Sequence, residues 1–443
     1  MRPWTTRIRI ESRAMRDLFL GVVIPAALVW ALFSAPGSIL VLNWIWFQRP
    51  YDFSWGIWNT RPLFLIALAI AILSNLLHGQ LRPKFPPILI VYTLFLVWIT
   101  LSTAFAFNSD LAWQYYRTFL PSMWVAPFVL FATIHDLRLL KWVLWVAAGG
   151  IGFNAAKTGV SLTLAGGGHL TDQISGFVGD NNVFGLVLCL VIATLMGLRT
   201  DLPRKWWVQS TFYGFIAAIV MCIVYTKSRG AVITLGLLFV LVSLFGPRPI
   251  RSLLVLIVVA ALGYWLIPDN YFDRLDTLSD LRADESAMGR VENWTLAWEA
   301  AVHHPFFGVG PNNHIAYNHA LFPEVQVRVA HSVYFQVLGE LGFVGLFLYL
   351  WFMFLVFRSL GGVLRDARQG QANSADVIFV RSLAFWLLCG FGAYSVGAGL
   401  LNMLYIEFPW YLAFYGTMLH QHAQFGRRPR EHFSKQELAL AGR

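Results

Sequence analysis

Residues 329–347 read VAHSVYFQVLGELGFVGLF, and this stretch changes from loop to helix within a few positions. After His331 the chain stays mostly apolar up to Arg358, which is long enough to cross the hydrocarbon core of a membrane. His331 stands at the mouth of this span, and Glu340 stands inside it. Ionisable groups are unfavourable in a membrane, so both positions need a physical reason.

The same kind of stretch recurs along the whole chain. Of the 443 residues, 57% are hydrophobic and only 13% are charged, whereas soluble domains carry about a quarter charged residues. Apolar runs of about 16 to 26 residues are typical of membrane-spanning helices. We therefore predict an all-α polytopic membrane protein with about twelve transmembrane helices. The expected spans are 17–33, 62–77, 86–106, 119–135, 139–163, 182–198, 208–226, 230–246, 251–267, 332–358, 379–403 and 408–422.

The basic residues predict the orientation of these spans. Most of them form clusters that fall on one side of the membrane if both chain termini lie inside, as the positive-inside rule requires. The net charge of +10 therefore does not indicate nucleic-acid binding. The first 16 residues are expected to be a cytoplasmic leader to the first span. A further apolar piece, 37–48, would break the alternation and is expected to be a re-entrant or half-length element.

Four regions follow from this pattern: a transmembrane bundle at 1–267, a large outer loop at 268–330, C-terminal transmembrane helices at 331–424 and a basic tail at 425–443. A structureless loop as long as 268–330 would be unusual, so we expect it to fold or to carry function. Its apolar residues predict a helix near 285–303 that packs on the bundle or contacts the membrane interface. The predicted apolar face comprises Ala287, Met288, Val291, Trp294, Trp298 and Ala301.

The three cysteines and a row of glycines fit a tightly packed bundle. Because each cysteine lies inside an apolar span, we expect buried small hydrophobic side chains rather than disulfides or metal ligands. Glycines at three-residue spacing around Glu340 permit close helix packing. The cysteines are Cys189, Cys222 and Cys389, and the glycines are Gly339, Gly342 and Gly345.

Ten basic residues face outward in this topology, where the positive-inside rule does not explain them. The short turn TKSRGA, residues 226–231, places Lys227 and Arg229 at the outer membrane surface. Two cations at this depth suit a phosphate or pyrophosphate, although snorkelling to lipid headgroups would also explain them. The ten are Arg49, Arg61, Arg117, Lys157, Lys227, Arg229, Arg274, Arg282, Arg290 and Arg328.

The stretch GRVENWTLAWEAAVHHPFFGVGPNN, residues 289–313, supplies another cation. Arg290 stands at the start of the predicted helix, where a guanidinium and a helix N-terminus together favour an anion. The glycines of GVGPNN match no nucleotide-binding fingerprint and are expected to be turn residues.

Five of the eleven histidines lie between 303 and 331, but their spacing is irregular and does not favour a metal site. His331, at the junction of loop and span, is the best placed of them to act as a general base in a wet cleft. A capping or headgroup-level histidine is the simpler alternative. Glu340 lies nine positions after His331 and is expected to make a structural hydrogen bond, for which another helix is one source of the partner.

These motifs together resemble the O-antigen ligase superfamily, which includes O-antigen polymerases and bacterial O-linked protein oligosaccharyltransferases. The resemblance rests on SRGA in an outer turn, on GR, W and HPFFGVGPNN in the long loop, and on HSVYFQVLGELGFVG after it. The motifs cover roughly residues 175–350 and separate the branches of the superfamily only weakly. The N-terminal third also resembles a set of O-glycosylation ligases.

The resemblance implies a C-type glycosyltransferase-like (GT-C) fold in a bacterial inner membrane, with the long loop and the active site in the periplasm. Members take a glycan from undecaprenyl diphosphate, and the ligase passes it to a sugar hydroxyl of lipid A core. Membrane lipids are the other expected partners, and no nucleic acid, metal or cofactor is expected. Arg229 and Arg290 match the family's essential arginines, and His331 matches its essential histidine. Lys227 and Arg328 are expected to assist substrate binding.

This reading agrees with the chemistry of the residues. Arginines can stabilise a diphosphate as it leaves, and a histidine can accept the proton of the attacking hydroxyl. Direct attack would invert the anomeric centre, whereas the retaining alternative needs a paired acid and nucleophile that the sequence does not single out. A polymerase or a protein glycosyltransferase of the same superfamily remains an alternative. A transporter is a more remote one, because no internal repeat is evident.

Overall fold

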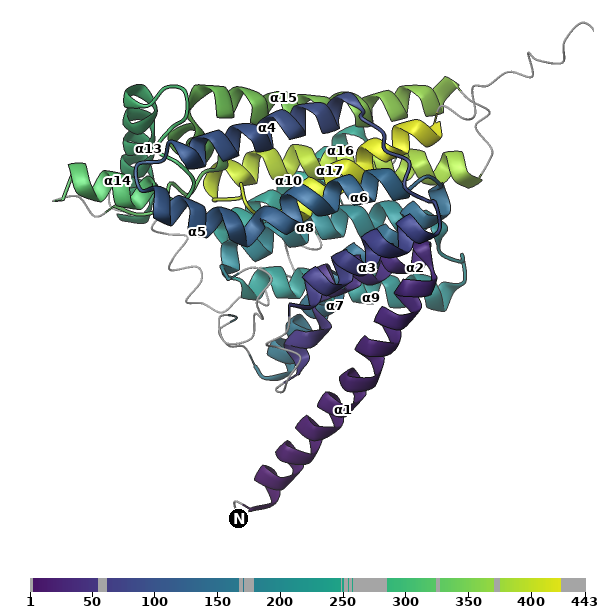
Figure 1. Ribbon diagram of the computed structural model, residues 1–443. Coiled ribbons are helices and arrows are strands. Elements are labelled where there is room, and N and C mark those ends of the chain that lie inside the picture. The colour runs from purple at the N-terminus through teal and green to yellow at the C-terminus, as the bar shows by residue number, and fades with distance from the viewer. Residues whose placement is uncertain are drawn as a thin grey trace, which may run out of the picture.

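The computed structural model describes residues 3–54, 62–166, 170, 179–247, 249–250, 254, 257, 285–323, 327–369 and 375–423. Within these ranges the chain is helical and contains no strand, as expected for an all-α protein (Figure 1). The helices are α1 (Pro3–Phe33), α2 (Ala35–Asn43), α3 (Leu63–Leu77), α4 (Pro87–Ala104), α5 (Ser109–Leu120), α6 (Ala126–Thr133), α7 (Leu137–Leu164), α8 (Asn181–Leu198), α9 (Trp206–Tyr225), α10 (Arg229–Phe245), α13 (Glu285–His303), α14 (His314–Leu321), α15 (Val333–Gln369), α16 (Ala375–Gly397) and α17 (Glu407–Ala423).

Seven helices among the described residues are long and apolar enough to cross a membrane, and α3 and α10 are shorter apolar helices. The chain is therefore a multi-pass membrane protein by composition and helix length. Of the other predicted spans, 119–135 falls on a helical stretch with a π-helical turn at Pro121–Val125, and 408–422 forms α17. The span at 251–267 lies almost wholly outside the described residues, so the expected twelve crossings stay a prediction.

The apolar piece at 37–48 forms a short helix, α2, followed by a π-helical turn at Trp44–Gln48. Ser34 caps α2, because its side chain accepts a hydrogen bond from the Gly37 N–H at 3.1 Å. The element ends at Arg49, whose backbone is left-handed with a φ of 50°. The short helix α2 is consistent with the half-length element that we expected at 37–48 from the alternation of basic clusters between spans.

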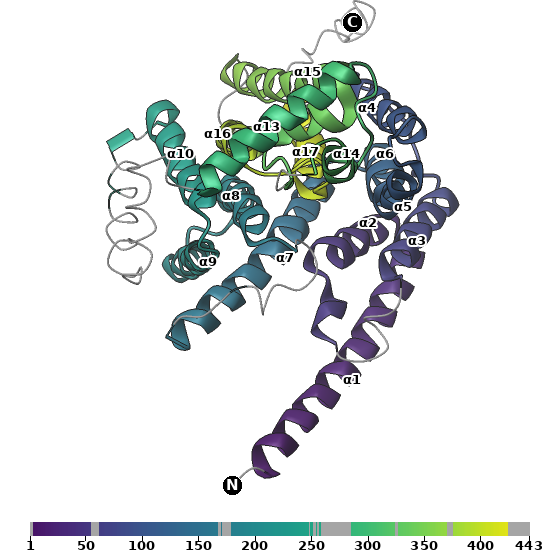
Figure 2. The same cartoon turned by 90° about the vertical axis from the view of Figure 1, so that its left-hand side faces the viewer.

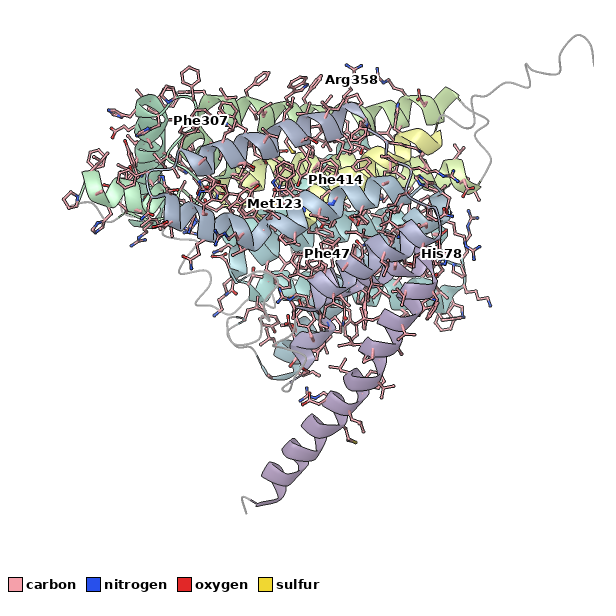
Figure 3. The ribbon with its side chains drawn as sticks, in the orientation of Figure 1. Phe47, His78, Met123, Phe307, Arg358 and Phe414 are labelled. Carbon is pink, nitrogen blue, oxygen red and sulfur yellow. The ribbon has the colours of Figure 1, made fainter. Side chains whose placement is uncertain are left out.

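The centre of the bundle is α8, which packs against α7, α10 and α16. Nearly all of its side chains are buried, including Cys189, and the other two cysteines are buried as predicted. A second packing centre is the Trp410 ring of α17, which contacts aromatic rings of α4 and α15. Rings of α4 and α15 also pack against Phe414 of α17, which Figure 3 labels near the middle of the molecule.

Three long helices, α8, α10 and α15, begin at the same end of the bundle. Gly185, near the start of α8, packs against Ala231 in the first turn of α10. Tyr334, at the start of α15, donates a hydrogen bond to the Ser395 carbonyl near the end of α16 at 2.7 Å. We call this the α13 end, since α13 and α14 lie there in Figure 1. Figure 3 places Phe307 at this end and Arg358 further along α15 towards the other.

Candidate functional site at the α13 end of the bundle

The helix that carries Glu340 is broken. Gly342 of α15 has a φ of 71° and a ψ of −173°, a conformation that is accessible to glycine and strongly disfavoured for other residues. The segment 304–310 docks against the break, and Gly308 lies so close that an added Cβ would stand 2.4 Å from the Glu340 carbonyl carbon. The glycines of GVGPNN are turn residues, as predicted, and both Gly308 and Gly310 have positive φ values.

The backbone groups that the break leaves without helical partners are bonded by neighbouring segments. The Gly339 carbonyl accepts from the Val309 N–H, and the Glu340 carbonyl accepts from the Gly310 N–H, both at 2.9 Å. The next carbonyl along, of Leu341, accepts from the indole N–H of Trp98 on α4 at 2.9 Å. Buried backbone groups need such partners, so the outer segment and α4 together stabilise the break.

The predicted helix at 285–303 forms α13 with those bounds, and Figure 2 shows it crossing the ends of α15, α16 and α17. Its apolar face differs from the predicted one. Met288, Val291 and Trp298 are each about half exposed, and the buried positions include Leu296, Ala297, Ala300 and Ala301. Small residues face the bundle because α13 packs closely on α15, where Gly339 approaches Ala297. The larger apolar residues of α13 therefore face away from the bundle. Their contact with the membrane interface stays a prediction.

The segment leading into α15 is held by three side chains. The amide of Asn293 on α13 accepts from the Arg328 N–H at 2.8 Å. The indole N–H of Trp294 donates to the Ala330 carbonyl at 2.8 Å. On the other side of His331, the Ser332 N–H donates to the amide oxygen of Asn402 at 3.2 Å. His331 lies between these anchors in a left-handed conformation with a φ of 46°, which a residue with a Cβ adopts only when its surroundings enforce it.

Charged groups from three parts of the chain act on the pKa of His331. Burial lowers the pKa of His331 below its ordinary value of 6.5, and Arg290 and Arg328 lower it further. Asp180 acts in the opposite sense and raises that pKa. Because these groups influence one imidazole, Arg290, Arg328 and Asp180 lie near it. A histidine held neutral near physiological pH is able to accept a proton.

The turn between α9 and α10 lies at the same end. Lys227 is left-handed with a φ of 53°. Ser228 caps α10, since its hydroxyl oxygen accepts from the Ala231 N–H at 3.2 Å, and Arg229 is the first residue of the helix. Lys227 and Arg229 are half-buried. A guanidinium at a helix N-terminus is well suited to an anion.

The other four histidines of the loop are dispersed. His303 bonds to its own helix, His304 packs edge-on against Tyr317, and His319 is exposed. His314 is 5% exposed, and its Nδ1 lies 3.2 Å from the Asn318 amide nitrogen. Within the described ranges no group of three or more His, Cys, Asp or Glu side chains could hold a metal ion.

Glu340 has the hydrogen-bond partner that the sequence required. The Tyr405 hydroxyl, from the connection between α16 and α17, donates to its Oε2 at 2.8 Å. The Gln336 amide lies 3.5 Å from its Oε1. The predicted hydrogen bond is confirmed, but its partner comes from a connecting segment and not from another helix.

Sequence reasoning missed four residues that shape the surroundings of His331. No sequence pattern places Asn293, Trp294 and Asn402 beside His331, because their hydrogen-bond partners are distant in the chain or are backbone groups. Asp180 had a recognisable signal, since an aspartate before an apolar run is a typical N-cap. Its carboxylate accepts from the Asn182 and Val183 N–H groups at 2.7 and 3.0 Å. Its second role, beside His331, has no local signal.

Comparison with known families covers most of this architecture. Residues 212–350, which include Arg229, Arg290 and His331, match the family described as O-antigen ligase. Residues 15–211 match a family of unknown function (DUF5935). No curated protein matches the chain. The match over residues 212–350 supports the superfamily of O-antigen ligases and polymerases for this part of the chain, and it does not distinguish the two.

Proposed function

We propose that this protein is an O-antigen ligase that transfers a glycan from undecaprenyl diphosphate to a sugar hydroxyl of lipid A core on the periplasmic face of the inner membrane. The match to glycosyltransferase-like enzymes supports the reaction class. The observation that carries the proposal is the arrangement around His331, whose backbone is held in a left-handed conformation and whose imidazole is influenced by Arg290, Arg328 and Asp180. Such strain is typical of functional sites.

Electrostatics support an anionic donor at this end. The N-termini of α8, α10 and α15 lie together here, and each carries a partial positive charge. Arg229 and Lys227 add full charges at the start of α10, and Arg290 and Arg328 add two more beside His331. A lipid diphosphate is a negatively charged ligand that complements these positive charges, and an arginine side chain can donate two hydrogen bonds to its oxygens simultaneously.

In the proposed reaction the acceptor hydroxyl attacks the anomeric carbon of the donor sugar. The new glycosidic bond forms as the bond from that carbon to the diphosphate oxygen breaks, and the configuration inverts. His331 accepts the proton of the hydroxyl, and the arginines stabilise the negative charge that develops on the diphosphate. No step requires a metal ion.

A reconstituted transfer assay tests this function. Purified protein receives undecaprenyl-diphosphate glycan with and without lipid A core, in the presence of a chelator. Glycan on lipid A core, formed only when that acceptor is supplied, is the expected product. Longer lipid-linked chains without transfer to lipid A core would instead establish a polymerase. Absence of both products from folded protein would refute the ligase and direct the assay to protein acceptors.

Variants of the arginines test the diphosphate contact. Arg229→Ala and Arg290→Ala are expected to raise the KM for the donor, and Arg→Lys is expected to restore only part of the loss, because lysine cannot form the bidentate contact. Arg117→Ala on α5 is a control, since this arginine is exposed and is not among the charged groups that shift the pKa of His331. Full activity of the Arg229→Ala, Arg290→Ala double variant would exclude a diphosphate clamp.

A further inference from the structure

A polar cavity lies behind the segment that carries His331. It has a volume of about 200 Å³, which is the liquid volume of roughly six or seven water molecules. Val329 and Ala330 form part of one wall, and Glu340 lines it as well. The lining residues are Tyr115, Asn312, His314, Ile315, Val329, Ala330, Gln336, Glu340, Asn402, Tyr405 and Ile406.

His314 gives this cavity an unused hydrogen-bonding group. The side chain is 5% exposed, and among the described residues its Nε2 has no hydrogen-bond partner. The Asn318 amide nitrogen donates to its own helix at the His314 carbonyl and lies 3.2 Å from the His314 Nδ1. Nδ1 is then the acceptor and Nε2 carries the proton. Burial lowers the pKa of His314 to about 4, so the imidazole is neutral and offers one N–H donor.

Other polar groups of the cavity are held in place by hydrogen bonds. The Glu340 carboxylate is fixed by Tyr405 and Gln336. Asn402 holds Ser332, so the cavity wall and the His331 backbone share one anchor. Buried polar groups that remain without a partner are unfavourable, so the cavity is suited to a polar occupant.

The charge of the lining selects the class of occupant. Glu340 brings a carboxylate, and neither lysine nor arginine is among the described residues that line the cavity. The described lining therefore has no cation to pair with a diphosphate, whereas a neutral polyol finds a donor, several acceptors and the rings of Tyr115 and Tyr405. The volume leaves room for a single sugar ring.

We propose that this cavity binds one sugar ring of the acceptor and thereby positions the attacking hydroxyl at His331, with His314 and Glu340 as specificity-determining contacts. The inference rests on the proposed function and divides the site in two. The cationic side of segment 328–332 receives the donor diphosphate, and the carboxylate side receives the acceptor sugar.

Steady-state kinetics test this division. His314→Ala and Glu340→Gln are expected to raise the KM for the acceptor about tenfold, the effect of one lost hydrogen bond in a buried site, while the KM for the donor stays unchanged. Val329→Phe narrows the cavity from a position that is 37% exposed, so it should raise the same KM without disturbing the fold. His319→Ala is the matched control, because His319 is exposed on the same helix as His314.

A crosslinking experiment separates failure of this inference from failure of the proposed function. A benzophenone amino acid replaces Ile315, which lines the cavity and is 44% exposed. Crosslinks to lipid A core and not to the lipid-linked donor, weakened by His314→Ala, are expected even if transfer itself is not detected. Crosslinks to the donor alone would overturn the inference. The inference would also be overturned if transfer occurred without any acceptor crosslink and the Val329→Phe variant kept the wild-type KM for the acceptor. The cavity would then hold only water.

Discussion

The break in α15 allows a sharp test of the architecture around Glu340. Gly342→Ala places a Cβ where the Phe306 carbonyl oxygen would be 2.3 Å away and the Pro305 carbonyl oxygen 2.6 Å away. These atoms are backbone, so they cannot rotate aside. The substitution also forces alanine into a backbone conformation that is nearly exclusive to glycine.

The magnitude follows from these two effects. The backbone strain is about 1–3 kcal/mol, and relief of the steric overlap adds about 1–3 kcal/mol. Gly342→Ala should therefore lower the free energy of unfolding by about 2–6 kcal/mol. Gly361→Ala is the matched control in the same helix, since a Cβ there meets no atom within 4 Å. It should stabilise the protein by up to about 1 kcal/mol, because alanine favours the helix.

The assay is thermal unfolding of both variants in detergent, followed by intrinsic tryptophan fluorescence. The apparent Tm of Gly342→Ala should fall by several degrees, whereas that of Gly361→Ala should equal or exceed the wild-type value. Transfer activity should also fall in Gly342→Ala at temperatures where it is folded, because the docked segment 304–310 leads to the cavity-lining residues Asn312 and His314. If both variants unfold at the same temperature, α15 is continuous and the docking of 304–310 on its break is wrong.

Three further outcomes concern the histidine site. His331→Ala should abolish transfer while the Tm is retained; activity in a folded variant would remove His331 from the mechanism. Since the neutral imidazole is the base, the rate should fall as pH drops through the pKa of His331. Arg290→Ala removes a neighbour that lowers this pKa, so the acid limb of the pH–rate profile should move to higher pH, and Asp180→Asn should move it to lower pH. Trp294→Phe loses the hydrogen bond to the Ala330 carbonyl and should reduce kcat by about threefold to tenfold. Trp298→Phe is the control and should have little effect, because the Trp298 side chain is 50% exposed. Equal effects of the two substitutions would contradict the role of Trp294 in holding the segment before α15.

The sequence by itself determined the helical class and the course of most helices. A span must satisfy every backbone group internally and present apolar side chains over its length, so it leaves a long local signal that residue types alone reveal. The bounds of α8, α9 and α13 follow the predicted ranges closely for this reason. The candidate residues Arg229 and Arg290 were also recognisable in the sequence, since cations on the outer side are not explained by the usual charge pattern. His331 was recognisable from its position at the junction of loop and span.

Only the tertiary structure decided what surrounds those residues. Periodicity marks α15 as one continuous helix, yet the break at Gly342 depends on backbone groups of 305–310 and on Trp98 of α4. The buried face of α13 is set by how closely it packs on α15, which side-chain hydrophobicity does not encode. The proximity of Asp180 to His331 and the cavity between His314 and Glu340 arise from segments far apart in the chain. Hydropathy is a local property of a sequence, whereas electrostatic environment and cavity shape are properties of contacts between distant segments, and these exist only once the chain has folded.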